Sequence, residues 1–203
     1  MESISVEKQM ISYISNLPQG KIFFPENFQD LGSEEAVRQA LHRIEKNGVL
    51  IRLAQGIYLY PKKDDILGVL YPSLDEVARA IAKRDRARII PTGVQALNKL
   101  GLSNQIPMKA VYLTDGAARE IQVGKSTIKF KRTTPKNLAV KGEISGLVIQ
   151  ALREIGKDQM TSSQRDQIYE LLQKEDPATL RHDATLAPAW IRKIMLESTK
   201  PKV

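Results

Sequence analysis

Hydrophobic and polar positions follow the clearest pattern between residues 33 and 60. Val37, Leu41 and Ile44 recur at helical spacing, which predicts that residues 33–47 form an amphipathic helix with one apolar stripe. Ser33 is a favourable N-cap residue, and the two glutamates after it suit the positive end of the helix dipole. The basic and amide side chains of this helix fall outside the stripe and are therefore predicted to face outward.

A short β-hairpin is predicted directly after this helix. Residues 49–53 and 57–60 are two β-rich runs, and the turn between them contains Gly56. A helix with an outward basic face that leads into a small hairpin is typical of a winged helix-turn-helix. This pattern indicates binding to double-stranded DNA.

The preceding residues complete a domain that we predict over residues 1–66. Apolar spacing predicts a helix over 6–17, a short strand over 21–24 and a brief helix over 25–31 that begins with a proline. Residues 61–65 are expected to be a surface connection.

A second domain is predicted over residues 71–203. Its pattern begins with a capping box and a helix over 73–83 and becomes helical again after Gly142. Between these helical parts, strands are predicted over 88–90, 109–114, 119–123 and 126–132, with a helix over 94–100. The predicted fold class is α+β, with an N-terminal winged helix-turn-helix followed by a mixed α+β domain that has a helical C-terminal part.

The composition narrows the possible chemistry. The chain has 203 residues and no cysteine, which excludes disulfides, thiolate zinc sites and cysteine nucleophiles. The N-terminal residues lack the basic and apolar regions of a signal peptide, and no apolar run approaches the ~20 residues that span a bilayer. We therefore expect a cytoplasmic protein with no membrane partner.

The net charge of +8 is unevenly distributed along the chain. Residues 1–70 carry 8 Lys/Arg and 9 Asp/Glu, whereas residues 79–141 carry 14 Lys/Arg and 3 Asp/Glu, a net of +11. A segment this basic attracts polyanions, because each neutralised phosphate releases condensed counterions. Most of the positive charge therefore lies outside the predicted DNA-binding domain.

The outward face of the 33–47 helix and the hairpin carry the candidate DNA contacts. Arginine can contact guanine edges or phosphates, glutamine can contact adenine, and a helix N-terminus can bind a phosphate. Glutamates on the same helix oppose simple phosphate attraction, so we expect weak non-specific affinity from this domain alone. The candidate residues are Ser33, Arg38, Gln39, His42, Arg43, Lys46, Arg52 and Gln55.

A second group of basic residues is predicted to form a basic face on the second domain. Lys129 and Lys131 alternate with Ile128 and Phe130, which predicts one buried and one basic side of a strand. This face can be a solvated surface, can add phosphate contacts, or can dock an acidic partner. Its predicted members are Arg84, Arg86, Arg88, Lys125, Lys129, Lys131 and Arg132.

The sequence contains no pattern that predicts catalysis. His42 and His182 are the only histidines, and neither has the neighbouring ligands that a metal site needs. No glycine-rich phosphate loop and no nucleophile with an adjacent base is present. We therefore predict a protein that is not an enzyme, with no catalytic residues, no metal and no cofactor.

Short motifs along the chain resemble the AbiEi-type antitoxins of type IV toxin–antitoxin (abortive infection) systems. In the first domain they are Ala40-Leu41, Arg43-Ile44, residues 48–52 and residues 56–58; later ones are residues 91–93, 96–97, 100–102 and 112–114, and Ala187-Pro188 with Trp190. The resemblance covers most of the chain and implies a winged helix that binds operator DNA and represses its own operon. It also implies a C-terminal domain that counters a nucleotidyltransferase-like toxin without a stable complex.

The leading hypothesis is a DNA-binding transcriptional regulator of antitoxin type. The alternative is a protein-interaction module whose basic second domain docks an acidic protein or RNA. The operator sequence, the oligomeric state and the presence of a toxin gene nearby are not encoded in any pattern of this chain.

Overall fold

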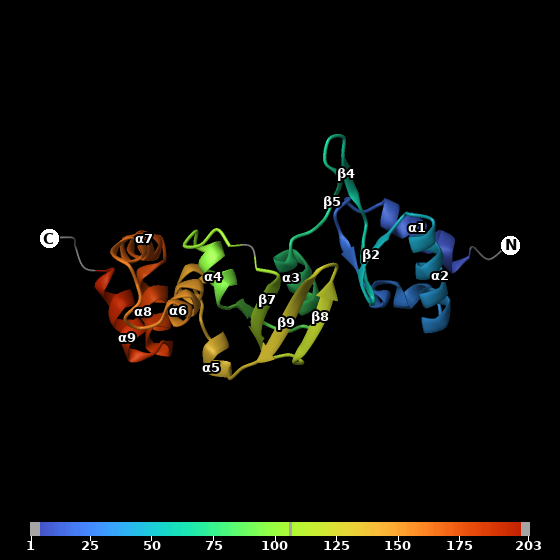
Figure 1. The fold of residues 1–203 in the computed structure, drawn as a ribbon. Coiled ribbons are helices and arrows are strands. Elements are labelled where there is room, and N and C mark those ends of the chain that lie inside the picture. Colours follow the sequence, from blue (N-terminus) through green and yellow to red (C-terminus); the bar gives the residue numbers. More distant parts are fainter. Residues whose placement is uncertain (1–4, 106, 200–203) are drawn as a thin grey trace. The chain divides into compact units, whose positions relative to one another are not determined.

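The computed structural model describes residues 5–105 and 107–199 (Figure 1). The chain divides into two compact units, the first formed by residues 1–80 with 122–124 and the second by residues 81–121 with 125–203. Both units contain helices and strands, so the α+β class is confirmed. Independent folding of domains over 1–66 and 71–203 stays a prediction.

The first unit contains two α-helices, a 3₁₀-helix and short strands. Its elements are α1 (Val6–Ser15), β1 (Ile22–Phe23), η1 (Pro25–Leu31), α2 (Glu34–Lys46), β2 (Ile51–Ala54), β3 (Ile57–Leu59), β4 (Lys62–Asp64) and β5 (Gly68–Leu70). The helix α2 agrees with the predicted amphipathic helix, and Ser33 caps it. The brief helix predicted at Pro25 is present, but it has 3₁₀ rather than α geometry.

The core of the first unit joins its helices to a small antiparallel sheet. The strand order is β1-β3-β2, and Phe23 of β1 stacks on Phe28 of η1 with ring centroids 5.6 Å apart. The apolar stripe of α2, including Leu41 and Ile44, is buried in the same core as Met10 of α1. This packing fixes which face of α2 is left exposed.

A second hairpin, formed by β4 and β5, occupies the region that was predicted to be a surface connection. That prediction was wrong, because the turn is held by a local contact that hydrophobic spacing does not reveal. The Asp64 carboxylate accepts hydrogen bonds from the backbone N–H groups of Ile66 and Leu67, each at 2.9 Å, and Gly68 has a positive φ of 72°. Ile66 and Leu67 at the tip are 92% and 74% exposed.

A four-stranded sheet and a helical part make up most of the second unit. The helix α3 (Leu74–Arg84) spans the boundary between the two units. The later elements are β6 (Ile89–Pro91), α4 (Val94–Lys99), β7 (Lys109–Thr114), β8 (Arg119–Val123), β9 (Ser126–Arg132), α5 (Pro135–Leu138), α6 (Glu143–Ile155), α7 (Ser162–Leu172), α8 (Pro177–Leu186) and α9 (Ala189–Glu197). The predicted bounds of β7, β8 and β9 are confirmed.

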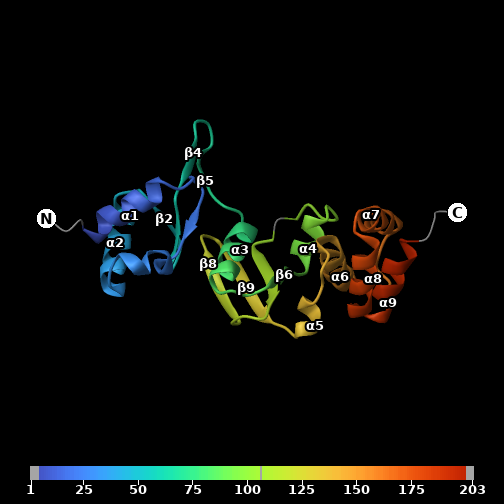
Figure 2. The ribbon, with the colours of Figure 1, turned by 180° about the vertical axis from the view of Figure 1, so that it is seen from behind.

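The sheet of the second unit has the order β6-β7-β9-β8 (Figure 2). The strands β7 and β9 are parallel, with Tyr112 opposite Phe130, whereas β6 and β7 are antiparallel. Ile128 and Phe130 are buried while Lys131 is exposed, so the predicted alternation of β9 is confirmed. The parallel pairing places the end of β9 beside the end of β7.

The helices α6 to α9 pack around a separate apolar core, and α4 joins this core from the side of the sheet (Figure 1). The charged side chain of Asp183 is fully buried there. Its carboxylate accepts hydrogen bonds from the backbone N–H groups of Lys141 (3.0 Å) and Gly142 (2.8 Å). Because Asp183 belongs to α8, these two bonds hold the start of α6 against α8. The carboxylate also lies 2.7 Å from Nδ1 of His182.

Among the described residues, no helix is both long and apolar enough to cross a membrane.

Candidate nucleic-acid interface

A groove of about 520 Å³ lies between α2 and the β2–β3 hairpin of the first unit. Five of the predicted DNA contacts, from two separate elements, line this one groove: Arg38, Gln39, His42, Arg52 and Gln55. Leu41 and Tyr58, which are both buried, and the half-buried Glu45 also contribute to its wall. The fold therefore brings together hydrogen-bonding side chains from positions 38 to 55.

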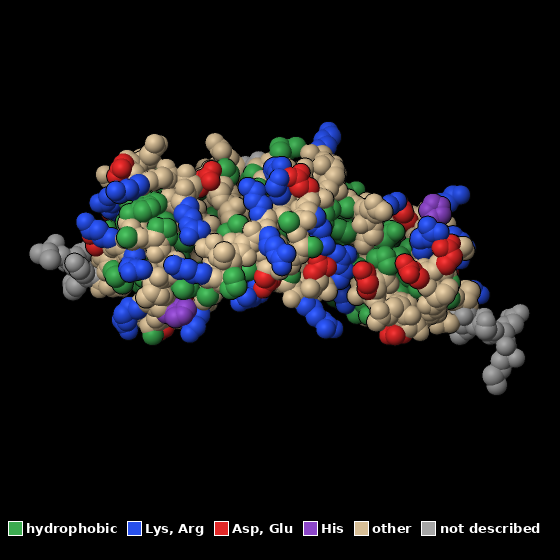
Figure 3. Space-filling view, turned by 90° about the horizontal axis from the view of Figure 1, so that it is seen from below, with side chains coloured by type: hydrophobic (Ala, Val, Ile, Leu, Met, Phe, Trp, Pro, Cys, Tyr) green, Lys and Arg blue, Asp and Glu red, His purple; other side chains and the backbone are tan. Residues whose placement is uncertain are grey.

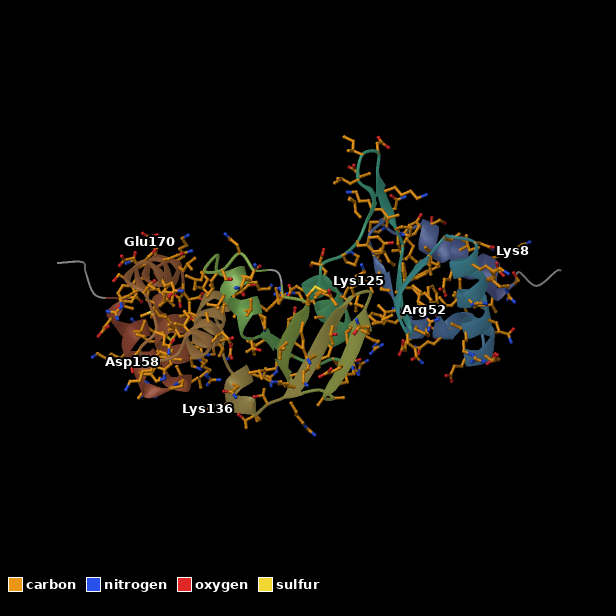
Figure 4. The ribbon with its side chains drawn as sticks, in the orientation of Figure 1. Lys8, Arg52, Lys125, Lys136, Asp158 and Glu170 are labelled. Atoms are coloured by element: carbon orange, nitrogen blue, oxygen red, sulfur yellow. The ribbon has the colours of Figure 1, made fainter. Side chains whose placement is uncertain are left out.

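Two backbone features of the hairpin orient its polar side chains towards the groove. Arg52, which is labelled in Figure 4, is paired with Tyr58. The strand register shifts between Arg52 and Ala54, as in a β-bulge. The turn is closed by Gln55 and Gly56, and Gly56 has a φ of 69°, which an L side chain rarely adopts. The turn that the sequence predicted at Gly56 is thus required to place Gln55 at the groove.

Glu35 lies within the group of predicted contacts on α2. Its carboxylate accepts hydrogen bonds from Nε (3.1 Å) and Nη2 (2.7 and 2.9 Å) of Arg38 and from Nε2 of Gln39 (2.9 Å). The hydrogen bonds from Arg38 and then from Gln39 lower the pKa of Glu35 below its ordinary value of 4.5. The hydrogen bonds to Glu35 also raise the pKa of Arg38 above its ordinary value, so both groups are charged at neutral pH.

The sequence interpretation gave Glu35 two effects, a favourable one on the helix dipole and an unfavourable one on phosphate, but no contact with Arg38 or Gln39. The signal for these contacts was present in the spacing, since residues three and four positions apart are neighbours on a helix. Arg38 and Gln39 are at these two distances from Glu35.

Three other predicted contacts do not line the groove. The Ser33 hydroxyl oxygen accepts a hydrogen bond from the N–H of Ala36 at 3.3 Å, so Ser33 caps the helix. Nε of Arg43 lies 2.7 Å from a carboxylate oxygen of Glu7, which directs Arg43 towards α1. Lys46 is exposed in the last turn of α2.

Several residues of the predicted basic face of the second unit form ion pairs with acidic side chains. Arg88 pairs with Asp115 at 2.9 Å and Arg84 pairs with Asp85 at 2.8 Å. Lys129 pairs with Glu120. These ion pairs neutralise three of the seven residues that were predicted to form that face. The charge count of this segment includes these three acids, but it did not show which cations they pair with, because Asp115 and Glu120 are distant in sequence from Arg88 and Lys129.

The remaining members of that group lie at two ends of the sheet. At one end of the sheet, Arg132 of β9 is opposite Thr114 of β7, and Thr114 is opposite Ile89 of β6. Because residues 86–88 directly precede Ile89, Arg132 lies at the same end of the sheet as this segment. Lys125 lies in the turn before β9, whereas Lys136 lies in α5, which follows the end of β9. The two lysines are at opposite ends of the sheet (Figure 4). In Figure 3, Lys and Arg side chains are spread over the visible face with Asp and Glu side chains among them.

The comparison with protein families gives one result for most of the chain. A family of unknown function, DUF6088, matches residues 9–180. The chain belongs to DUF6088. Its fold is also similar to a solved structure, described as the crystal structure of the RV2827C protein from Mycobacterium tuberculosis. The two chains are 14% identical with a TM-score of 0.46, over 98% of this chain and 83% of that one. No curated protein matches the chain.

The groove of this DUF6088 protein is lined by several hydrogen-bond donors and by one acid, Glu45, while Glu35 binds the groove residues Arg38 and Gln39. In the part of the chain that the structure describes, no group of three or more His, Asp or Glu side chains is arranged to hold a metal ion. His42 lies at the groove, whereas His182 contacts the buried Asp183. The arrangement suits the recognition of a hydrogen-bonding surface by guanidinium and amide groups.

Proposed function

We propose that the first unit is a winged helix-turn-helix, and that this protein is a DNA-binding transcriptional regulator of antitoxin type. One observation carries the proposal, namely the convergence of Arg38, Gln39, Arg52 and Gln55 on a single groove. A major groove admits one α-helix, and a wing beside that helix can reach the adjacent backbone. In this proposal α2 is the recognition helix and the β2–β3 hairpin is the wing.

The groove side chains have distinct roles in the proposed complex. Arg38 contacts guanine and Gln39 contacts adenine, because these side chains match the donor and acceptor patterns of those bases in the major groove. Arg52 and Gln55 contact the sugar–phosphate backbone and fix the register of the protein on the duplex. Residues 1–70 carry a net charge of −1, so sequence-independent attraction by this region is weak and base contacts carry a large share of the affinity.

The second unit supplies further charge in this proposal. Arg86, Lys131 and Arg132 are exposed, and in the described part of the chain none of them has an ion-pair partner. They are available for phosphate contacts. The antitoxin part of the proposal rests on the resemblance to AbiEi-type proteins, in which this unit counters a nucleotidyltransferase-like toxin in the cytoplasm without a stable complex.

Fluorescence anisotropy with labelled duplexes tests the proposal. The probe is the duplex immediately upstream of the gene's own start codon, and a shuffled duplex of equal length is the reference. We expect salt-sensitive binding with a preference for the upstream duplex. Arg38→Ala should remove most of this preference, at a cost of about 1–3 kcal/mol.

Lys8→Ala is the matched control, because Lys8 is an exposed cation of the same unit on α1, outside the groove (Figure 4). It should leave the preference unchanged. Equal binding of both duplexes by the wild-type protein, or an equal effect of the two variants, would contradict the proposal.

A second candidate function is docking of an acidic protein or RNA, and the unpaired cations of the second unit favour it. Affinity capture with and without nuclease separates this function from the first. Docking would be supported by a protein partner that survives nuclease treatment, or by RNA that is recovered without nuclease, if that partner is lost in a Lys131→Ala, Arg132→Ala variant. Recovery of duplex DNA alone would support the regulator.

A further inference from the structure

Glu35 is a negative charge at the place where the proposed recognition helix meets anionic DNA. Arg38 and Gln39 lie one helical turn after Glu35 on the exposed face, and both side chains donate hydrogen bonds to it. The side chains of Arg38 and Glu35 are 76% and 57% exposed. An ion pair this exposed contributes little to stability, so the fold does not depend on it.

The geometry of the pair leaves part of Arg38 free. A guanidinium group has five N–H donors in a fixed plane. Glu35 engages Nε and Nη2, and Nη2 lies within hydrogen-bond distance of both carboxylate oxygens. Nη1 makes no hydrogen bond to Glu35, so its two N–H groups are left to donate to the guanine acceptors O6 and N7. Arg38 can therefore bind Glu35 and one guanine at the same time.

Gln39 is constrained by the same carboxylate. Its amide nitrogen donates to Glu35, which fixes the side chain with one N–H and the carbonyl oxygen left for a base. Holding both side chains in place before binding lowers the conformational entropy that is lost on contact. The carboxylate also repels phosphates, which penalises any docking in which α2 lies against the backbone instead of the base edges.

We propose that Glu35 is a specificity-determining residue of this protein, which aligns Arg38 for one guanine and disfavours non-specific duplex. This inference rests on the proposed function, since it assigns a role within the same DNA-binding groove. It assigns to Glu35 a contribution to base discrimination and a weakening of non-specific affinity.

Selection from a randomised duplex pool, followed by sequencing of the bound fraction, tests the inference. The proteins compared are the wild type, Glu35→Gln, Glu35→Ala and the control Glu34→Gln. Glu34 is exposed in the same first turn of α2, and it makes no hydrogen bond or ion pair among the described residues. Glu34→Gln and Glu35→Gln remove the same charge, so they differ only in the contacts of the carboxylate.

We expect the wild type to select a guanine at one or more positions of the bound duplexes. Glu35→Gln and Glu35→Ala should each weaken the preference at one of these positions by about tenfold and bind shuffled duplex more tightly. Glu34→Gln should strengthen binding to all duplexes by one common factor and keep every preference. A melting temperature within a few degrees of wild type, as expected for an exposed position, verifies folding.

The outcomes separate this inference from the proposed function. If the wild type selects a sequence and Glu35→Gln selects it equally well, Glu35 has no role in specificity while the regulator function stands. If Glu34→Gln and Glu35→Gln lose the same preference, the effect is one of charge and the positioning role is overturned. If the wild type selects no sequence at all, both proposals fall.

Discussion

Glu35 and Asp183 are carboxylates that each accept several hydrogen bonds, yet they lie in opposite surroundings. Glu35 is on the exposed face of α2, and its partners are side chains. Asp183 is fully buried, and it binds the backbone at the start of α6 together with His182. The first unit thus keeps this carboxylate at its surface, while the second unit buries one.

This difference shows how burial decides what a hydrogen-bonded carboxylate can do. Water competes for every hydrogen bond of Glu35, so Arg38 and Gln39 can bind another ligand at little cost. Asp183 has no such competitor, and its loss leaves buried N–H groups without a partner. We therefore assign the exposed network to recognition and the buried one to the architecture of the helical part.

The largest effect is expected from Asp183→Ala. Loss of the buried carboxylate leaves the N–H groups of Lys141 and Gly142 unpaired and should lower the free energy of unfolding by about 3 kcal/mol. Urea unfolding can be followed through Trp190, the single tryptophan, which packs against the same helical core. Asp158→Ala, at an exposed position, should change stability by less than about 0.5 kcal/mol. Similar changes in the free energy of unfolding for both variants would show that the buried hydrogen bonds of Asp183 do not stabilise the helical part.

Replacing Lys131 and Arg132 with alanine should change how DNA binding depends on salt. If both side chains contact phosphate, the slope of log K against log salt falls by about 1.8, while the base preference stays as in the wild type. Arg38→Ala should do the reverse and reduce the preference with little change in slope. Anisotropy titrations at several salt concentrations measure both quantities. An unchanged slope in the double variant would exclude these cations from the interface.

A smaller change is expected at Arg86, the one non-glycine residue with positive φ in the described part of the chain. Arg86 follows α3 with a φ of 52°, and the N–H of Ala87 bonds to the carbonyl of Ala82 across this turn. Glycine adopts this conformation without strain, so Arg86→Gly should raise the free energy of unfolding by about 1 kcal/mol. Arg86→Ala keeps the strained backbone and should give no gain. Equal stability of the two variants would argue against strain at this position.

The smallest effect concerns acid sensitivity. Hydrogen bonds from the backbone and then the side chain of Arg88 lower the pKa of Asp115 below its ordinary value of 3.8. A lowered pKa stabilises the fold above the unfolded value, and this contribution is lost as pH falls through the folded value. Asp115→Asn should therefore reduce the melting temperature near neutral pH and flatten its decline between about pH 5 and pH 2. A decline as steep as that of the wild type would show that Asp115 does not contribute.

Sequence periodicity predicted the elements whose burial is one-sided. The helix α2 and the strand β9 each present one apolar face, so their spacing and bounds were readable from residues such as Leu41, Ile44 and Phe130. The β4–β5 hairpin was missed because β4 is exposed, β5 is only half-buried, and the turn between them depends on Asp64. The parallel pairing of β7 with β9 depends on contacts distant in sequence, which local patterns do not encode.

The candidate site was predictable in its residue types and less so in its geometry. Helical phase identified Arg38, Gln39 and His42 as outward side chains, and they do line the groove. Arg43 has the same residue type, but Glu7 of another helix captures it. Partners of this kind become visible only when elements are packed together, as with Lys129 and Glu120 in the second unit.

The tip of the β4–β5 hairpin makes the chain accessible to limited proteolysis. Ile66 and Leu67 project from a ladder of only three residue pairs, so a protease that cleaves after leucine meets an exposed and easily opened bond. One such cut separates the polypeptide into a fragment that carries the α2 groove and a fragment that carries the four-stranded sheet. Brief digestion is therefore a direct route to studying the two fragments apart.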